Sequence, residues 1–367
     1  MDRIGVAQIV HSLEIGGMER VAAYLAMESS PAYRPLVICL TIKGHFAPQV
    51  EAAGIEVIEL HKRAGVDLRL PQRLARILKE RNIQIVHAHN SGPMFTGTLA
   101  GRLARVKGII VTDHSRQLPE RFRVMATEWV MSRLADEIVS VSEHNKIDLV
   151  ERLHWPADKI KVIANGVVET PPISPECAAA LRQEFGITPR VPVILSAARL
   201  EPQKNMGALV AAAALLRGRG LPVKVLLVGE GSERPFLERQ IAQNGLQDQV
   251  VLTGFRLDAL ALYRVADIFA LPSRWEGLPM SILEAMSAKI PIVSTDVGDV
   301  NKAVKDGRNG LLVPSGDIQQ MADGLYQLLT NKAQRRQFGE AGYQIWHDQY
   351  SVAQMVKSYE ELYARYV

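Results

Sequence analysis

The chain has 367 residues, of which 47% are hydrophobic and 22% charged, and its formal net charge is +4. This is the composition of an ordinary globular protein with room for two domains. The only two cysteines, Cys39 and Cys177, lie far apart without a CxxC partner, which argues against a disulfide framework or a structural zinc site. No apolar run approaches the roughly 18 residues of a spanning helix, and the first residues lack a signal-peptide core, so a cytoplasmic protein is expected.

Strand-like apolar runs alternate with helical patterns through the first half of the chain. Strands are predicted at residues 4–10, 35–42, 55–60, 83–87, 108–112, 137–141 and 161–164. Helical periodicity is clearest at residues 18–28, 70–81 and 92–105. This βαβ alternation predicts a parallel sheet covered by helices.

A proline-rich stretch follows, with Pro171, Pro172 and Pro175, and it predicts a linker between two domains. The alternation restarts with strands predicted at residues 191–197, 222–228, 250–253, 267–271 and 291–294, and three helical segments follow from residue 319. The sequence therefore predicts an α/β protein of two Rossmann-like, doubly wound domains facing each other across a cleft. In such sheets ligands bind at the carboxyl ends of the strands.

The excess of basic residues lies entirely in the N-terminal half, through Asn165. They cluster at Lys62, Arg63, Arg69, Arg73, Arg76, Lys79 and Arg81, and again at Arg116, Arg121 and Arg123. One interpretation is a solvated helix face. The other is attraction to an anionic membrane surface, at the inner face of the plasma membrane, or to a phosphate-bearing acceptor. Nucleic acid is disfavoured because no basic stripe carries interleaved aromatic residues.

The segment SRWEGLPMSILEAM, residues 273–286, places an acid on each side of a helix start. Pro279 suits the first turn of a helix, and the backbone N–H groups of Gly277 and Leu278 would precede that helix unpaired. Such a helix N-terminus favours an anion, ideally a phosphate. Glu276 in the loop and Glu284 on the helix would then hold two different polyols at the two ends of a phosphate bridge.

These residues closely resemble a known motif. Glu276 and Glu284 match the E-x7-E motif of retaining glycosyltransferases with the GT-B fold, in the large glycosyltransferase family 4. The blocks SAARLEPQKN, VGEGSERPFLE, LTGFRLDALALYRVADIFALPS, GRNGLLVPSGD, HSLEIGGMERVA and IANGV resemble further family blocks in order and spacing. The resemblance covers essentially the whole chain. It implies a domain at residues 1–168 for the acceptor, completed by a last helix at about 350–367, and a nucleotide-sugar domain at 169–349.

The resemblance also implies roles for particular residues. Arg199 and Lys204 match the cations that clamp the donor diphosphate, although a pair of surface cations is the alternative. Glu284 matches the acid that holds the ribose, and Glu276 the acid at the donor sugar. The remaining implied contacts are a diphosphate loop at Gly16 and Gly17, a glycine at Gly229, and a base cradle at Gly254, Phe255 and Arg256.

The histidines allow several interpretations. His87 and His89 alternate at a strand end, where a metal pair is conceivable, but a structural or cleft-lining role is favoured because no further ligands accompany them. His114 resembles the T-x-H histidine at the junction of donor sugar and acceptor; a satisfied loop histidine is the alternative. The helical stripe Leu118, Phe122, Met125 and Trp129 fits either core or a membrane-facing surface.

The implied reaction is front-face transfer of a sugar, with retention, from a UDP-sugar or, second, a GDP-sugar to a glycan or lipid-linked acceptor, in envelope or exopolysaccharide synthesis. No cofactor or metal is expected, because the Arg199 and Lys204 clamp would neutralise the leaving group. A nucleotide-sugar epimerase and a non-catalytic binding subunit are the alternatives. One departure from the family pattern, Asp299 through Lys302 after STDVG, is expected to alter the donor pocket.

Overall fold

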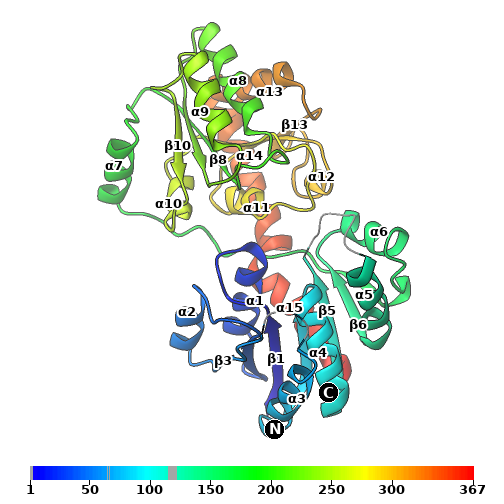
Figure 1. Ribbon diagram of the computed structural model, residues 1–367. Helices are drawn as coiled ribbons and strands as arrows, with labels where there is room; N and C mark the ends of the chain where they lie inside the picture. The colour runs from blue at the N-terminus through cyan, green and yellow to red at the C-terminus, as the bar shows by residue number, and fades with distance from the viewer. Residues whose placement is uncertain (1–2, 64, 66, 115–121) are drawn as a thin grey trace. The chain divides into compact units, whose positions relative to one another are not determined.

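The computed structural model describes residues 3–63, 65, 67–114 and 122–367. Its contacts divide the chain into two compact units: an N-terminal unit of residues 1–166 with 352–367, and a C-terminal unit of residues 167–351. The predicted boundaries lie at 168/169 and 349/350. Each unit is an α/β body with its own parallel sheet (Figure 1).

The N-terminal unit contains a seven-stranded sheet in the order β3-β2-β1-β4-β5-β6-β7, with every neighbouring pair parallel. Its strands are β1 (Ile4–Val10), β2 (Tyr33–Cys39), β3 (Val57–Glu59), β4 (Ile83–His89), β5 (Gly108–Asp113), β6 (Glu137–Ser140) and β7 (Ile160–Val162). Its helices are α1 (Gly17–Met27), α2 (Ala47–Ala52), α3 (Leu70–Glu80), α4 (Ser91–Ala104), α5 (Phe122–Leu134), α6 (Glu143–Glu151) and α15 (Val352–Tyr363). The central strands are buried on both faces, which explains their continuous apolar runs.

The C-terminal unit contains a six-stranded parallel sheet in the order β10-β9-β8-β11-β12-β13. Its strands are β8 (Val193–Ala197), β9 (Lys224–Val228), β10 (Val250–Gly254), β11 (Ile268–Leu271), β12 (Ile292–Thr295) and β13 (Gly310–Val313). Its helices are α7 (Pro175–Glu184), α8 (Met206–Gly218), α9 (Arg234–Gln243), α10 (Ala259–Tyr263), α11 (Met280–Ser287), α12 (Val300–Ala303), α13 (Ile318–Thr330) and α14 (Lys332–Ile345). Both sheets thus follow the Rossmann order 3-2-1-4-5-6 within their own unit.

The predicted alternation of strands and helices matches the structure except at a few places. The strand β13 was not predicted, because its four residues show no distinctive period. The three predicted C-terminal helices are α13, α14 and α15, and a π-helical turn at Trp346–Tyr350 separates the last two. The linker runs into α7, which begins at Pro175 behind the N-cap Ser174, whose hydroxyl accepts a hydrogen bond from the backbone of Cys177.

The segment 352–367 completes the N-terminal unit, far in sequence from the strands it covers. On α15, Tyr359 and Tyr363 are buried, and their hydroxyls reach the side chains of β4 and β5. Among the described residues, none of the helices is long and apolar enough to cross a membrane.

Candidate active site

The loops that follow β8 and β11 begin next to each other at the carboxyl edge of the C-terminal sheet. These two strands are neighbours, yet the chain leaves β8 toward β9 on one side and leaves β11 toward β12 on the other. At such a switch point the loops diverge and leave a crevice, which is where doubly wound sheets bind ligands. The loop after β8 carries Arg199 and Lys204, and the loop after β11 carries Glu276.

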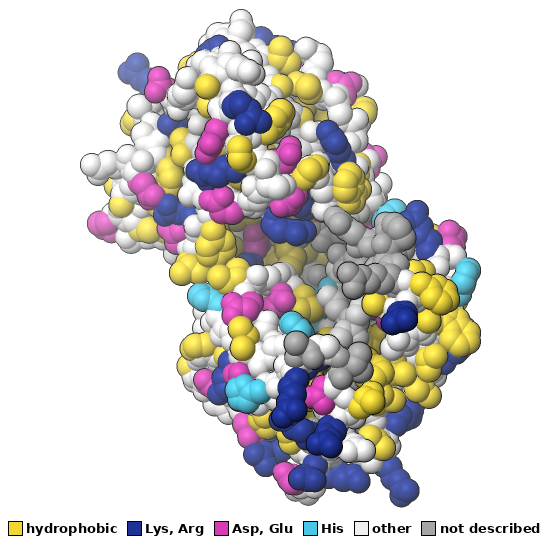
Figure 2. Space-filling view, viewed as in Figure 1, with side chains coloured by type: hydrophobic (Ala, Val, Ile, Leu, Met, Phe, Trp, Pro, Cys, Tyr) yellow, Lys and Arg dark blue, Asp and Glu magenta, His cyan; other side chains and the backbone are white. Residues whose placement is uncertain are grey.

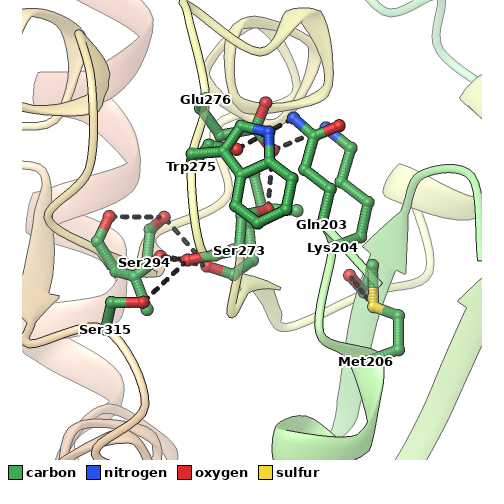
Figure 3. A network of polar contacts seen from close by, with 11 residues as sticks. Gln203, Lys204, Met206, Ser273, Trp275, Glu276, Ser294 and Ser315 are labelled. Atoms are coloured by element: carbon green, nitrogen blue, oxygen red, sulfur yellow. Dashed lines mark hydrogen bonds and ion pairs between the residues drawn. The ribbon is translucent and has the colours of Figure 1, made fainter. Parts of the chain in front are cut away.

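Lys204 and Glu276 point toward each other from these two loops (Figure 3). Lys204 Nζ lies 2.5 Å from Glu276 Oε1, and Ser273 Oγ donates to the same oxygen at 2.6 Å. Both charged side chains are largely buried, with 14% and 5% of their surface exposed. Glu276 Oε2 makes no hydrogen bond with any described residue. The carboxylate is therefore anchored through one oxygen, and the other can accept a hydrogen bond from a ligand.

Further hydrogen bonds hold the Glu276 loop in place. Thr295 Oγ1, at the end of β12, donates to the carbonyl oxygen of Ser273 at 2.6 Å. Gln203 Nε2, from the loop after β8, donates to the carbonyl oxygen of Trp275 at 2.9 Å (Figure 3). The loops of three neighbouring strands thus fix one another, and the ion pair does not depend on a single flexible loop.

The start of α11 lies beside this pair. The helix begins at Met280, and Pro279 is its N-cap in an extended conformation, so the prediction that Pro279 belongs to the first turn is wrong by one residue. The backbone N–H groups of Gly277 and Leu278 donate to no other backbone group within the described ranges. Such unpaired amides at a helix N-terminus can bind an anion.

Gly298 packs directly against the Glu276 loop. A Cβ at this position would lie 1.9 Å from the carbonyl oxygen of Glu276, and its φ of +56° already favours glycine. The next residue, Asp299, donates its backbone N–H to the carbonyl oxygen of Gly277 at 3.1 Å. Asp299, where the sequence departs from the family pattern, therefore lies against the loop that carries Glu276. Its buried side chain is one cause of the raised pKa of Tyr350, after burial itself.

Glu284 is buried on α11, and Glu284 Oε2 accepts a hydrogen bond from the hydroxyl of Tyr263 at 2.8 Å. Tyr263 is fully buried and its ring stacks on Phe269, with centroids 5.7 Å apart. The carboxylate is therefore held in one orientation at the second end of the motif.

Arg199 is exposed, and its side chain makes no hydrogen bond or ion pair to any residue in the described ranges. Its turn rests on Gly229, where φ is +136° and a Cβ would lie 2.1 Å from the carbonyl oxygen of Ala198. Only glycine tolerates both conditions. Gly229 therefore supports the turn of the predicted cation.

The three residues of the predicted base cradle differ in which of their groups are open to a ligand. Gly254 lies at the carboxyl end of β10 and pairs with Gly229, whose N–H donates to its carbonyl oxygen at 3.0 Å. Phe255 is 52% exposed. The guanidinium of Arg256 forms ion pairs with Glu184 and Asp258, which raise its pKa, so only the backbone of Arg256 is available for a ligand.

In the N-terminal unit, the start of α1 and the loops after β4 and β5 are likewise linked at one edge. Asn90 Oδ1 accepts the backbone N–H of His114 at 2.8 Å, and Asn90 Nδ2 lies 3.2 Å from the sulfur of Met18. Gly16 is the N-cap of α1 and Gly17 its first residue. The φ of Gly16 is −173°, which any residue adopts, so backbone strain does not explain this glycine.

His87 and His89 are fully buried, and their rings lie side by side with centroids 4.2 Å apart. Burial lowers the pKa of His87 to about 3 and that of His89 well below its usual value. Both nitrogens of each ring are hydrogen-bonded within the unit. Within the described residues, no three His, Cys, Asp or Glu side chains are arranged to hold a metal ion.

Several residues that position the site were missed from the sequence. Ser273, Tyr263 and Gln203 act through side-chain hydrogen bonds. Asn90 links the loops after β4 and β5, and Gln8 on β1 links to His89 on β4. Of these, only Ser273 had a usable signal, since it stands three residues before Glu276 in the motif segment.

Comparison with known proteins gives two family models in succession along the chain. The model described as glycosyltransferase family 4 matches residues 15–170, and the model described as glycosyl transferases group 1 matches residues 178–345. Together they cover most of the chain.

Curated relatives are glycosyltransferases. The chain is 28% identical over 290 residues to an α-D-kanosaminyltransferase of Streptomyces kanamyceticus, covering 74% of each chain. It is 27% identical to a UDP-Gal:α-D-GlcNAc-diphosphoundecaprenol α-1,3-galactosyltransferase of Escherichia coli, covering 72% of this chain and 71% of the relative.

Solved structures show the same fold. A glycosyltransferase of Rickettsia africae matches with a TM-score of 0.85 at 21% identity, over 100% of this chain and 99% of that one. HepE of Anabaena in complex with UDP and glucose matches with a TM-score of 0.86 at 22% identity, over 99% and 100% of the two chains.

Replacement of Gly298 by alanine tests the support of the Glu276 loop. The new methyl group must displace the carbonyl oxygen of Glu276, so we expect a loss of stability of about 2 kcal/mol and a displaced ion pair. Gly307→Ala is the matched control, because Gly307 has a similar φ of +70° but no atom within 4 Å of its Cβ position. Urea unfolding of both variants provides the measurement. Equal losses would contradict a specific role of the contact with Glu276.

The buried histidines predict a pH dependence of stability. The unfolded chain binds protons at His87 and His89 below about pH 6.5, whereas the folded chain does not, so the free energy of unfolding falls as the pH decreases from there. Each histidine contributes a slope of up to roughly 1.4 kcal/mol per pH unit. Urea unfolding between about pH 7 and pH 5 should show this slope, and His87→Gln should reduce it. A slope unaffected by His87→Gln would count against the burial of a neutral ring.

Proposed function

Because this chain belongs to glycosyltransferase family 4 and matches the glycosyl transferases group 1, we propose that it is a hexosyltransferase. It would move the hexosyl group from a nucleoside-diphosphate sugar to a hydroxyl group of a glycan or lipid-linked acceptor. The observation that carries this proposal is the Lys204–Glu276 pair beside the unpaired amides of Gly277 and Leu278. Cations and amides at a helix start suit a diphosphate, and a carboxylate suits sugar hydroxyls. The family match does not favour an epimerase or a non-catalytic subunit.

The donor nucleotide is proposed to be UDP, with GDP as the second choice. The E. coli relative is named for UDP-galactose, and HepE was crystallised with UDP and with UDP-glucose. A GDP-mannose-dependent mannosyltransferase of Mycobacterium tuberculosis is also similar, at 28% identity. A lipid-linked acceptor in envelope or exopolysaccharide synthesis is supported by the E. coli relative, whose named acceptor is a diphosphoundecaprenol.

The proposed chemistry is front-face substitution with retention. Arg199 and Lys204 would stabilise the negative charge that develops on the departing diphosphate, in place of a divalent ion. Glu276, anchored through Oε1 by Ser273, would accept a hydrogen bond from the donor sugar through Oε2. Glu284, oriented by Tyr263, would hold the ribose. Because both acids then have binding roles, neither serves as the nucleophile of a double displacement.

A second proposed contact is with the membrane. The outward face of α5 carries large apolar side chains among polar and basic ones: Phe122 is 82% exposed, Trp129 43% and Val130 44%. The polar Glu128 and Ser132 are buried. Figure 2 shows hydrophobic side chains gathered on the side of the N-terminal unit that carries α4 to α6. Helices with an outward apolar face, aromatic residues and arginines bind in the plane of a lipid surface.

Basic side chains accompany this apolar face. Arg133 stacks on the ring of Trp129 at 3.5 Å, and Arg123 is exposed. We therefore assign the face to the anionic inner surface of the plasma membrane, where a lipid-linked acceptor resides. Met125 packs against the core, so the predicted stripe is divided between core and surface. Arg116, Leu118 and Arg121 of the predicted clusters lie outside the described residues.

Calorimetric titration with UDP, GDP and their sugars tests the donor site. We expect one diphosphate to bind, and Lys204→Ala or Arg199→Ala to weaken it by about 10- to 100-fold, the cost of a charge-assisted hydrogen bond. Arg308→Ala is the control, because Arg308 is an exposed cation in the turn before β13, at the opposite sheet edge. EDTA should leave binding unchanged. No binding by any nucleotide, or equal loss in the control, would overturn the donor site.

Sedimentation with lipid vesicles tests the membrane contact. The wild-type chain should bind vesicles containing phosphatidylglycerol and not vesicles of phosphatidylcholine alone. The double change Phe122→Ser and Trp129→Ser should lower binding at least tenfold, since burial of each side chain contributes roughly 1.5–3 kcal/mol. Phe236→Ser, on α9 and 46% exposed, is the matched control. Binding that is unaffected by the double change, or absent, would contradict the assignment.

A further inference from the structure

A continuous chain of hydrogen bonds runs through the interior of the N-terminal unit from the predicted site histidine to the C-terminal helix. His114 Nε2 lies 2.9 Å from His89 Nδ1, and His89 Nε2 lies 2.9 Å from Gln8 Oε1. The other end of the same amide, Gln8 Nε2, donates to the hydroxyl of Tyr363 on α15 at 3.2 Å. Gln8, His89 and Tyr363 are at most 3% exposed.

The chain continues beyond Tyr363. Its hydroxyl lies 2.7 Å from His87 Nδ1, and His87 Nε2 lies 2.7 Å from Thr112 Oγ1. Thr112 Oγ1 in turn lies 3.1 Å from the hydroxyl of Tyr359, also on α15. The hydroxyl of Tyr363 accepts from Gln8, and His87 Nδ1 is the acceptor that the described residues offer to its proton. The neutral ring of His87 then donates from Nε2 to Thr112.

The amide of Gln8 determines the direction of the bonds toward His114. Gln8 Oε1 can only accept, so His89 Nε2 must carry the proton. Burial keeps His89 neutral by lowering its pKa well below the usual value. A neutral ring has one N–H, so His89 Nδ1 is an acceptor and the proton between the two rings belongs to His114 Nε2.

His114 is therefore left with a lone pair on Nδ1. Its own pKa is lowered to about 3 by burial, so its ring too is neutral. Nδ1 is buried and has no hydrogen-bond partner among the described residues. A buried acceptor without a donor is unusual and marks a place where a ligand can supply one. The backbone N–H of His114 donates to Asn90 and its ring is hydrogen-bonded to His89, and these two bonds together hold the residue at this edge of the sheet.

We propose that Gln8 and Tyr363 are positioning residues that hold His114 as a hydrogen-bond acceptor, through Nδ1, for a hydroxyl group of the sugar substrate. The opposite tautomer would present an N–H, which can donate to any oxygen, including that of a phosphate or a carbonyl, whereas the lone pair of Nδ1 accepts only from a donor such as a sugar O–H. The assignment of the ligand to a sugar rests on the function proposed above. The orientation of the ring does not, because it follows from contacts within the N-terminal unit.

The tautomers can be read directly in the ligand-free protein by two-bond 15N–1H NMR correlation of the histidine rings. In the wild-type chain His114 and His89 should both show protonated Nε2 and unprotonated Nδ1. Tyr363→Phe removes the group that holds the Gln8 amide, and Gln8→Met removes the amide itself. In both variants the Nδ1 signal of His114 should move away from the value of an unprotonated nitrogen. The two variants lie on different elements, so agreement between them does not depend on one of them folding perfectly.

Tyr359→Phe is the matched control. Tyr359 lies on the same helix and is equally buried, but its hydroxyl contacts Thr112 and not Gln8. It should leave the His114 signals unchanged. In transfer assays, Tyr363→Phe and Gln8→Met should lower kcat/KM for the sugar donor about fivefold relative to Tyr359→Phe, as expected for one hydrogen bond.

A protonated Nδ1 on His114 in the wild-type chain would overturn the proposal. So would identical His114 signals in Tyr363→Phe and Tyr359→Phe, or a disturbed tautomer without any change of kcat/KM. If the chain instead transfers no sugar but the tautomers respond as described, the proposed function fails while the orientation of His114 stands. The two failures are thus distinguishable.

Discussion

The parallel pairing of β8 with β11 is the constraint on which the C-terminal site depends. All strands of a parallel sheet end at the same edge, but only where the chain reverses its direction of winding do neighbouring loops turn away from each other. At this point Lys204 and Glu276, which are 72 residues apart, come within 2.5 Å. The unpaired amides before α11 and the turn of Arg199 belong to the same edge. The strand order therefore determines which side chains can act together, and the loops only adjust their distances.

The fold and the local parts of the site could be predicted from the sequence, whereas the contacts between those parts could not. Gly277 and Glu276 were recognisable because they stand within a few residues of a helix start, where local geometry determines which groups are unpaired. The Lys204–Glu276 pair was not, since nothing local to either residue indicates the other. The strand β13 was missed because its four residues are too few to show a periodic pattern. Gly310–Val313 forms a strand through its pairing with β12, which the local sequence does not indicate.

The two units hold their polar groups in different ways. In the C-terminal unit, charged side chains lie at the loop edge, where a lysine and a carboxylate compensate each other. In the N-terminal unit, the buried polar groups are neutral, and each satisfies the next through single hydrogen bonds. The buried ion pair is costly to separate but leaves Glu276 Oε2 open toward an incoming ligand, whereas a buried neutral network keeps one arrangement. The first arrangement suits groups that must respond to a ligand, and the second suits groups whose orientation must stay the same.

The return of α15 to the N-terminal unit has a consequence for synthesis on the ribosome. His87 hydrogen-bonds Tyr363, which is 276 positions later in the chain, so β4 emerges long before its partner exists. The C-terminal unit is continuous from residue 167 to 351 and can fold as soon as it has emerged. Of the two units, the one whose strands emerge earlier is therefore completed later, and its buried histidines stay incompletely paired until α15 has left the ribosome. A chain that stops before Tyr359 would carry the Lys204–Glu276 pair but an incomplete N-terminal unit.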